Sequence, residues 1–378
     1  MKAVTYQGIK NVQVKEVQDP KIEKPDDIIV RITSSAICGS DLHLIHGLVP
    51  NFPTDYIIGH EPVGVVEEAG PEVTRVKRGD RVIIPFNVAC GHCWFCEHGL
   101  TSQCDNSNPH GDMGGFFGYA EAAGGYAGGQ AEYMRVPYAN FTPFKVPENC
   151  EVEDHKLAVI ADAMSTAYWS VDHAGVKPGD TVVVLGCGPV GLFAQKFCWL
   201  KGARRVIAVD YVDYRLERAR TRNNVETVNF EQEENIGNHL KEITHGGADV
   251  VIDAVGMDGK MTPMEFLATG LKLQGGALGA VIIASQAVRK FGTIQITGAY
   301  GGMYNAFPLG DLFNRNVDLL MGQAPVIPYI PQMYELVATG KIDPMDIITH
   351  VIPLSQAKAG YEAFDTKTDG CIKVVLKP

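Results

Sequence analysis

The pattern of hydrophobic and polar positions changes character near residue 160. Before that point, short apolar runs are separated by turns rich in glycine and proline, and helical periodicity is almost absent. Closely spaced short strands of this kind are typical of a β-rich, barrel-like domain. The runs that we expect to form strands include residues 28–32, 63–68, 81–85 and 131–136. Residues 111–129 hold eight glycines, which predicts a loop with unusual backbone angles.

After about residue 160, apolar strands alternate with segments of helical spacing. The expected strands are residues 181–185, 206–210, 226–230, 249–253, 292–298 and 317–321, with helices at 189–201 and 213–222. This alternation predicts a parallel, doubly wound sheet. The tail from about residue 324 has helix-like segments near 331–339 and 355–366, followed by a last strand over 371–377 that could rejoin the first domain.

Composition sets the class of protein. A chain of 378 residues suggests two domains, and 46% hydrophobic against 20% charged residues is typical of folded cores. The 44 acidic and 33 basic side chains leave a net charge of −11, which argues against a nucleic-acid groove or an anionic membrane surface. No run reaches the ~18 apolar residues of a membrane span, and the start has no signal-peptide pattern. We therefore expect a cytoplasmic protein.

Four of the nine cysteines cluster in the pattern Cys90-x2-Cys93-x2-Cys96-x7-Cys104. An odd total, tight spacing and no export signal argue against a disulfide framework. Four thiolates on one short loop suit a structural zinc, which prefers a closed tetrahedral set of ligands. An iron–sulfur cluster would also use four cysteines, although nothing else in the sequence indicates electron transfer.

A second set of metal-ligating types is spread more widely along the chain. Cys38 and His60 each lie next to a glycine, and a catalytic zinc needs three protein ligands and one open position. Asp162 is the candidate for the third ligand, because an unpaired carboxylate in its apolar stretch would be costly. Either Cys38 or His60 alone would indicate only a buried core residue.

A dinucleotide fingerprint follows the first strand of the second half. The fingerprint is Gly186-Cys187-Gly188-Pro189-Val190-Gly191, placed after an apolar strand and opening an apolar helix. That context distinguishes a pyrophosphate turn from a purely structural turn. Asp210 ends the next strand, where an acid binds ribose hydroxyls and repels a 2′-phosphate, so NAD is favoured over NADP. Arg215 lies close enough in sequence to cover the adenosine.

These motifs resemble the zinc-containing medium-chain alcohol dehydrogenases. The run Gly59-His60-Glu61-x2-Gly64-x5-Gly70-x2-Val73 is similar to that family's signature, and the other motifs follow in the family's order over essentially the whole chain. Many members have cysteine at the position of Asp162. The aspartate there is similar to the subgroup that contains glutathione-independent formaldehyde dehydrogenase, and so is the segment from Gly128 to Tyr133.

The resemblance implies an architecture and a set of cofactors. A GroES-like catalytic domain would comprise residues 1–163 and 324–378, and a Rossmann NAD-binding domain residues 164–323, with the active site in the cleft between them. One catalytic and one structural zinc are implied for each subunit, in a homo-oligomer that is a dimer or a tetramer.

The resemblance also assigns roles to single residues. Ser40 would take the substrate proton, and His43 would pass it outward, unless they are a turn residue and a surface residue. Glu61 would act beside the metal or as a transient ligand. Thr166 matches a nicotinamide contact, and Lys373 lies where the family often has an arginine near the pyrophosphate.

The predicted activity is hydride transfer between a small alcohol or aldehyde hydrate and NAD, with no nucleic acid or membrane as partner. Alternatives are a polyol dehydrogenase, a formaldehyde dismutase that never releases NAD, and a catalytically silent redox-binding protein.

The crossover over residues 257–291 is longer than one strand–helix unit of a parallel sheet needs. It would either cover the adenosine end of NAD or form a surface helix or an oligomer contact.

Overall fold

The computed structural model describes residues 1–49, 51–111, 113–257, 259–260 and 276–378. The chain divides into two compact units. The first unit comprises Met1–Ser165 and Pro325–Pro378, and the second unit comprises Thr166–Ala324. Within the described ranges, no helix has the length and apolar character needed to cross a bilayer.

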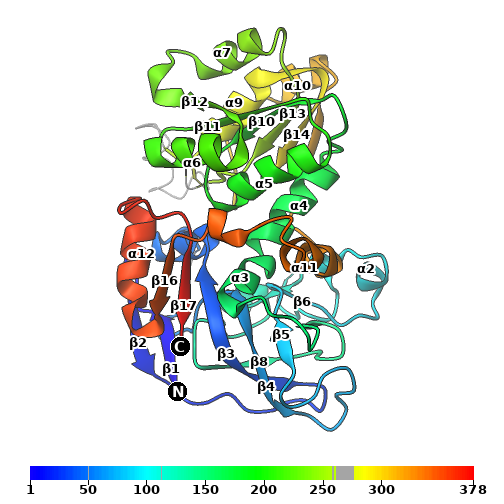
Figure 1. The fold of residues 1–378 in the computed structure, drawn as a ribbon, viewed down its shortest axis with the longest axis vertical. Helices are drawn as coiled ribbons and strands as arrows, with labels where there is room; N and C mark the ends of the chain where they lie inside the picture. The colour runs from blue at the N-terminus through cyan, green and yellow to red at the C-terminus, as the bar shows by residue number, and fades with distance from the viewer. Residues whose placement is uncertain (50, 112, 258, 261–275) are drawn as a thin grey trace. The chain divides into compact units, whose positions relative to one another are not determined.

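The first unit is built on a seven-stranded sheet in the order β16-β17-β3-β4-β5-β9, with β8 also pairing with β3 (Figure 1). Two separate pairs, β1-β2 and β6-β7, complete the strands of this unit. The strands of the whole unit are β1 (Lys2–Tyr6), β2 (Val12–Glu16), β3 (Ile28–Ile37), β4 (Glu61–Ala69), β5 (Arg81–Ile83), β6 (Asn87–Val88), β7 (Gly115–Phe116), β8 (Tyr133–Val136), β9 (Phe144–Lys145), β16 (His350–Pro353) and β17 (Val374–Lys377). The last strand pairs antiparallel with β3, placing Val374 opposite Ile37. The prediction that the tail rejoins the first domain is therefore confirmed.

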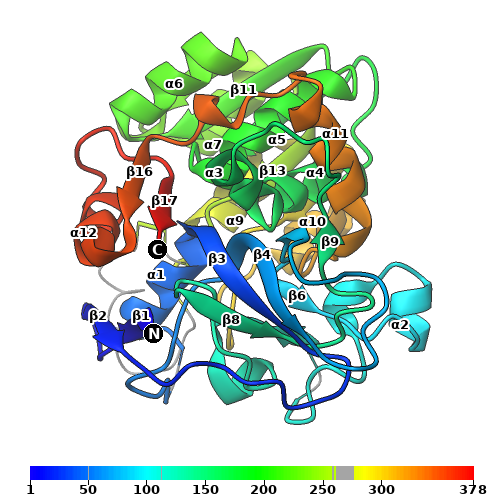
Figure 2. The ribbon, with the colours of Figure 1, turned by 60° about the horizontal axis from the view of Figure 1, so that its bottom comes forward.

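Short helices connect these strands. They are α1 (Gly39–Ile45), α2 (Trp94–Glu97), α3 (Asp154–Leu157), α11 (Ile330–Ala338) and α12 (Ala357–Thr366), with 3-10 turns η1 (Thr101–Gln103), η2 (Ala120–Ala123), η3 (Ala158–Ile160), η5 (Ile327–Tyr329), η6 (Pro344–Asp346) and η7 (Leu354–Gln356). Helix α12 lies beside β16 and β17 in both ribbon views (Figures 1 and 2). The glycine-rich segment is a loop broken by β7 and η2, and Gly118 and Gly124 have φ angles of +82° and +93°. The predicted loop is confirmed.

Helix α1 was not predicted from the sequence. It begins directly after Cys38, and Asp41 closes its first turn because one carboxylate oxygen accepts the backbone N–H of Cys38 at 3.0 Å. Leu44 and Ile45 are buried in an apolar core shared with α12. Burial of these two side chains compensates for the poor helix propensity of the Gly-Ser-Asp start.

The second unit contains a six-stranded parallel sheet in the order β12-β11-β10-β13-β14-β15. Its strands are β10 (Thr181–Leu185), β11 (Arg205–Asp210), β12 (Glu226–Asn229), β13 (Ala248–Asp253), β14 (Val288–Ile296) and β15 (Asp318–Met321). Its helices are α4 (Ala163–His173, which crosses the unit boundary), α5 (Pro189–Leu200), α6 (Asp213–Asn223), α7 (Ile236–Ile243), α9 (Gly279–Ala287) and α10 (Leu309–Asn314), with the 3-10 turn η4 (Phe230–Gln232). The predicted doubly wound sheet is observed.

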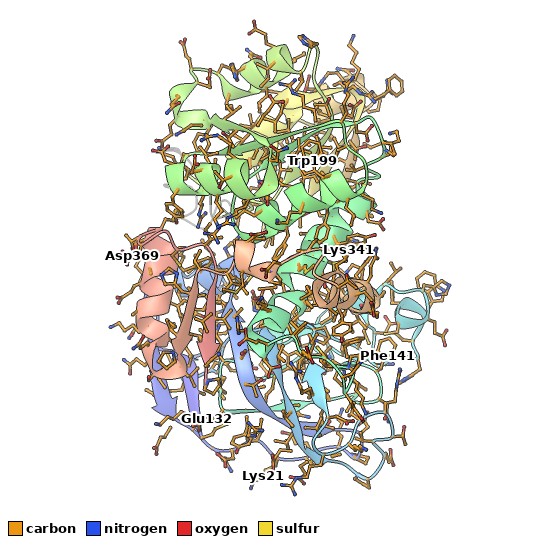
Figure 3. The ribbon with its side chains drawn as sticks, viewed as in Figure 1. Lys21, Glu132, Phe141, Trp199, Lys341 and Asp369 are labelled. Carbon is orange, nitrogen blue, oxygen red and sulfur yellow. The ribbon has the colours of Figure 1, made fainter. Side chains whose placement is uncertain are left out.

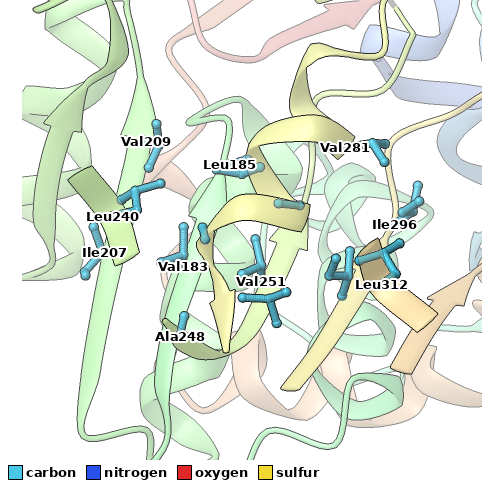
Figure 4. Packing of buried hydrophobic residues seen from close by; sticks show 14 of the residues in the cluster. Val183, Leu185, Ile207, Val209, Leu240, Ala248, Val251, Val281, Ile296 and Leu312 are labelled. Carbon is cyan, nitrogen blue, oxygen red and sulfur yellow. The ribbon is translucent and has the colours of Figure 1, made fainter. Parts of the chain in front are cut away.

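Burial on both faces explains the apolar strands of this sheet. Every residue of β10 is buried, and Val183 and Leu185 pack in a cluster with residues of β11, β13 and α9 (Figure 4). Helix α9 contributes Val281 and Ala284 to that cluster, so this part of the long crossover packs on the sheet. Residues 258 and 261–275 of the crossover lie outside the described residues.

Candidate active site and metal centres

Three predicted metal ligands meet in the first unit. The Cys38 Sγ lies 3.3 Å from the Asp162 Oδ2, and the His60 Nε2 lies 3.2 Å from the same oxygen. Strands β3 and β4 pair antiparallel, with Ala36 opposite Glu61, so Cys38 and His60 come together at one end of the pair. Asp162 lies between η3 and α4. The chain thus brings sulfur, nitrogen and oxygen donors to one buried point.

Burial makes this cluster electrostatically unfavourable for free anions. Burial, reinforced by the charge of Asp162, raises the pKa of the Cys38 thiol. Burial also raises the pKa of Glu61, to about 7, and Lys373 opposes that rise while Asp162 adds to it. Burial alone would lower the pKa of His60, but the carboxylates of Asp41 and Asp162 raise it well above its usual value.

The donor set fits a divalent cation. One ligand atom each from Cys38, His60, Glu61 and Asp162 lies within 4.8 Å of all the others. Buried like charges at this separation are costly unless a cation is shared between them. Zinc accepts thiolate, imidazole and carboxylate ligands together, and three protein ligands leave the fourth position open.

Asp41 completes the cluster, and it was missed from the sequence. Its Oδ1 lies 3.1 Å from the His60 Nδ1, on the opposite side of the ring from Asp162, and its side chain is fully buried. A carboxylate in this position fixes the tautomer and orientation of a metal-ligating histidine. The spacing of an acid three residues after the candidate metal-ligating cysteine was the available signal.

Glu61 is paired with a lysine of the last strand. The Lys373 Nζ forms an ion pair with the Glu61 Oε2, both side chains are 0% exposed, and the other Glu61 oxygen accepts the backbone N–H of Ala163 at 3.2 Å. Burial lowers and Glu61 raises the pKa of Lys373, with a net rise. Because its charge is engaged by Lys373, Glu61 is held beside the candidate metal position. The pyrophosphate role of Lys373 stays a prediction.

Both predicted relay residues lie on α1. The Ser40 Oγ is 3.8 Å from the Cys38 Sγ, and its hydroxyl also interacts with the phenol of Tyr119. His43 is buried and follows three residues later, so it lies on the same face of the helix. The rings of Phe86 and Tyr119 flank His60, at centroid distances of 6.2 and 5.7 Å. The serine therefore lies beside Cys38, and the relay itself stays a prediction.

The four clustered cysteines form a second centre. The sulfurs of Cys90 and Cys96 are 4.0 Å apart, and those of Cys93 and Cys104 are 3.9 Å apart. A disulfide would hold two sulfurs about 2.05 Å apart, whereas four thiolates bound tetrahedrally at about 2.3 Å from zinc are separated by about 3.8 Å. These distances fit a closed zinc site.

Hydrogen bonds from the surrounding loop reach the sulfurs of this centre, while burial raises the pKa of the Cys96 and Cys104 thiols. Backbone N–H groups donate to sulfur from Cys90 and His92, and the Asn106 side chain donates to the Cys90 Sγ at 3.2 Å. Hydrogen bonds, led by the backbone N–H of Cys96, overcome burial and lower the pKa of Cys93 to about 7. Phe141, labelled in Figure 3, packs against the centre where a side chain at Gly91 would collide with it.

The dinucleotide fingerprint has the geometry that its glycines predict. Gly186 has a φ of +91°, and a Cβ on Gly191 would lie 1.9 Å from the Gly186 carbonyl oxygen. Pro189 opens α5 at the position where its fixed φ is favourable. The free N–H groups at the start of this helix can therefore face a phosphate.

Asp210 and Arg215 lie at the same turn. The Asp210 carboxylate accepts backbone N–H groups from Cys187 at 2.7 Å, Tyr211 at 2.7 Å and Val212 at 3.0 Å. A Cβ on Gly188 would be 4.0 Å from the Arg215 Nη1. Thr166 lies in the first turn of α4. Cofactor contacts of Thr166, Gly186, Gly188, Pro189, Val190, Gly191, Asp210 and Arg215 stay predictions.

Comparisons with known proteins show the family of the chain. Residues 24–148 match the alcohol dehydrogenase GroES-like domain, and residues 189–270 match the zinc-binding dehydrogenase family. An uncharacterised zinc-type alcohol dehydrogenase-like protein of Bacillus subtilis is 71% identical over 378 residues, covering 100% of both chains. Glutathione-independent formaldehyde dehydrogenase of Pseudomonas aeruginosa is 33% identical over 386 residues, covering 96% of this chain and 94% of that protein.

A solved structure gives the same result. Alcohol dehydrogenase TADH from Thermus sp. ATN1 aligns with a TM-score of 0.85 and 33% identity, covering 100% of this chain and 99% of its own. The chain therefore belongs to the zinc-type alcohol dehydrogenase family. It is an oxidoreductase with a GroES-like domain and a Rossmann-type coenzyme domain, as the sequence predicted.

Proposed function

We propose that the protein transfers a hydride between a small alcohol or aldehyde hydrate, formaldehyde hydrate included, and NAD, using one catalytic and one structural zinc. The convergence of the Cys38, His60 and Asp162 donors on one buried point carries this proposal. The similarity to a formaldehyde dehydrogenase supports a small substrate. So do the uncharged rings of Phe86 and Tyr119 beside His60.

The residues around the centre have separate proposed roles in binding the metal and in moving the substrate proton. Cys38, His60 and Asp162 would hold the catalytic zinc, which when bound lowers the pKa of a coordinated hydroxyl and polarises a carbonyl. Ser40 would accept the substrate proton, and His43 would carry it onward. The aromatic rings beside His60 would limit the access of water and favour uncharged substrates.

The second unit would hold NAD, which accepts the hydride at its nicotinamide ring. The start of α5 offers backbone N–H groups to the pyrophosphate, and Asp210 would face the adenine ribose. The Asp210 Oδ1 accepts the backbone N–H groups of Tyr211 and Val212, and the Oδ2 accepts only that of Cys187. The carboxylate therefore keeps lone pairs that can accept hydrogen bonds from ribose hydroxyls.

A substrate panel tests the activity. Purified protein is expected to contain two zinc ions per chain and to form NADH with formaldehyde and with ethanol at higher kcat/KM than with sorbitol. Gel filtration measures whether NAD stays bound and also measures the predicted homo-oligomer. Preference for sorbitol would overturn the small-substrate proposal, and retained NAD with formaldehyde consumed but no net NADH would indicate a dismutase.

Cofactor choice gives a second prediction. Asp210→Ser is expected to lower the preference for NAD over NADP by at least about tenfold, because removal of about 1.4 kcal/mol of repulsion on a 2′-phosphate changes affinity tenfold. The readout is the ratio of the two dissociation constants, measured by NADH and NADPH fluorescence titration. A general loosening of the turn would weaken both cofactors equally, and an unchanged ratio would contradict the role of Asp210.

A further inference from the structure

A second layer of side chains holds the carboxylate that lies behind His60. Gln130 is fully buried, and its Nε2 donates to the Asp41 Oδ2 at 3.3 Å and to the Ala36 carbonyl at 3.2 Å. Its Oε1 accepts the hydroxyl of Tyr361 at 2.8 Å. Both amide hydrogens and the amide oxygen are therefore used, and the side chain has a single orientation.

Glycines make room for Gln130 next to the metal-ligating histidine. Gly59 directly precedes His60, and a Cβ on Gly59 would lie 2.2 Å from the Gln130 Cγ. Likewise, a Cβ on Gly128 would lie 2.2 Å from the Ile58 carbonyl oxygen. Backbone hydrogen bonds also join the two segments, including one from the Gln130 N–H to the Ile58 carbonyl at 3.1 Å. The packing therefore fixes Gln130 relative to the segment that carries His60.

Tyr361 connects the C-terminal helix to this layer. It lies on α12, is 2% exposed, and packs its ring in the apolar core that also contains Ile37 and Leu44 from the two sides of Cys38. Its hydroxyl reaches Gln130 across 231 residues of sequence. A tyrosine whose ring is held by the core presents its hydroxyl in a fixed place.

We propose that Tyr361 and Gln130 are positioning residues for the catalytic metal centre. They fix the carboxylate of Asp41, and that carboxylate orients the ring of His60. Groups that orient a ligating histidine change metal affinity or activity by about 10–100-fold. The inference rests on the proposed catalytic zinc. By orienting His60 through Asp41, Tyr361 and Gln130 would slow the release of that ion.

The rate of zinc release to a chelating dye tests the proposal. Wild-type protein is expected to release two zinc ions to the dye in two kinetic phases. The Asp162→Asn variant is expected to lack one of these phases, and that phase is assigned to the catalytic centre. Tyr361→Phe removes one hydroxyl and keeps the ring in its core. It is expected to speed the catalytic phase by about tenfold while the structural phase is unchanged. In the cobalt-substituted protein, the visible absorption bands of the catalytic site are expected to shift.

A double-substitution cycle separates this chain of contacts from general loosening. Gln130→Met removes the link through the amide but keeps the direct interaction of the Tyr361 hydroxyl with Asp41, so adding Tyr361→Phe to it is expected to accelerate the catalytic phase less than Tyr361→Phe does in wild type. Tyr300→Phe is the matched control. It deletes a tyrosine hydroxyl that donates to a buried carboxylate, Asp253, in the second unit. Zinc release from this control is expected to match wild type.

Three results would overturn the inference. They are a catalytic phase within twofold of wild type in Tyr361→Phe, equal acceleration of both phases, and additive effects in the double variant. A wild-type chain that binds only the structural zinc would instead overturn the proposed catalytic centre itself, and zinc content measured beforehand distinguishes that failure from the others.

Discussion

Asp162→Ala is expected to leave the chain folded, to remove one zinc per chain, and to lower turnover by about 10³-fold or more. Asp162 supplies the oxygen on which the sulfur of Cys38 and the imidazole of His60 converge, at 3.3 and 3.2 Å. Two remaining ligands hold zinc weakly. Loss of several kcal/mol of Lewis-acid stabilisation corresponds to a rate loss of this size. Elemental analysis and steady-state NADH formation give the two readouts, and circular dichroism reports the fold.

Two further substitutions make this result specific. Asp162→Cys replaces a carboxylate with a thiolate, which zinc also accepts, so we expect both ions to be retained. Asp172→Asn removes a carboxylate ten residues later, where Asp172 pairs with Lys201 at the surface, so we expect no change in zinc or turnover. If Asp162→Ala still binds two zinc ions as tightly as wild type, Asp162 is not a ligand.

Residue type and spacing were sufficient for the parts of the site that are chemically distinctive. After its first residue, the strand Thr181–Leu185 is apolar because both of its faces are buried, so its sequence alone indicated a parallel sheet. Cys38 and His60 could be selected only as a pair, and Asp162 could be selected because an unpaired carboxylate in an apolar stretch is costly. The four cysteines are informative because their spacing fits one small loop.

Other parts depend on contacts that no local pattern encodes. The short helix Gly39–Ile45 starts with weak helix formers, and its stability comes from the cap at Asp41 and from packing against distant residues. Gln130 and Tyr361 are ordinary core residues in sequence, and only their meeting across 231 positions shows the link to His60. Lys373 is similar, since its pairing with Glu61 appears only when the last strand joins the sheet.

Cys93→Ser is expected to remove the structural zinc and to lower the melting temperature of the first unit. Serine is a preferred N-cap, and Cys93 is the N-cap of α2, so the helix start is preserved and only the thiolate ligand is lost. Beyond its cysteines, the lobe has few apolar anchors, chiefly Ala89, Phe141 and Ile327. A loss of about 3 kcal/mol in the free energy of unfolding corresponds to a fall of about 6–12 °C in the melting temperature of a unit of this size.

The distribution of the damage distinguishes a structural metal from a catalytic one. Scanning calorimetry and zinc analysis give the size of the effect, and hydrogen exchange is expected to rise over residues 87–106 while kcat at low temperature stays close to wild type. Cys150→Ser is the matched control, because Cys150 is a half-buried free thiol outside both clusters. A Cys93→Ser protein that keeps two zinc ions and melts with wild type would contradict a structural zinc, since a closed four-thiolate site cannot lose a ligand without cost.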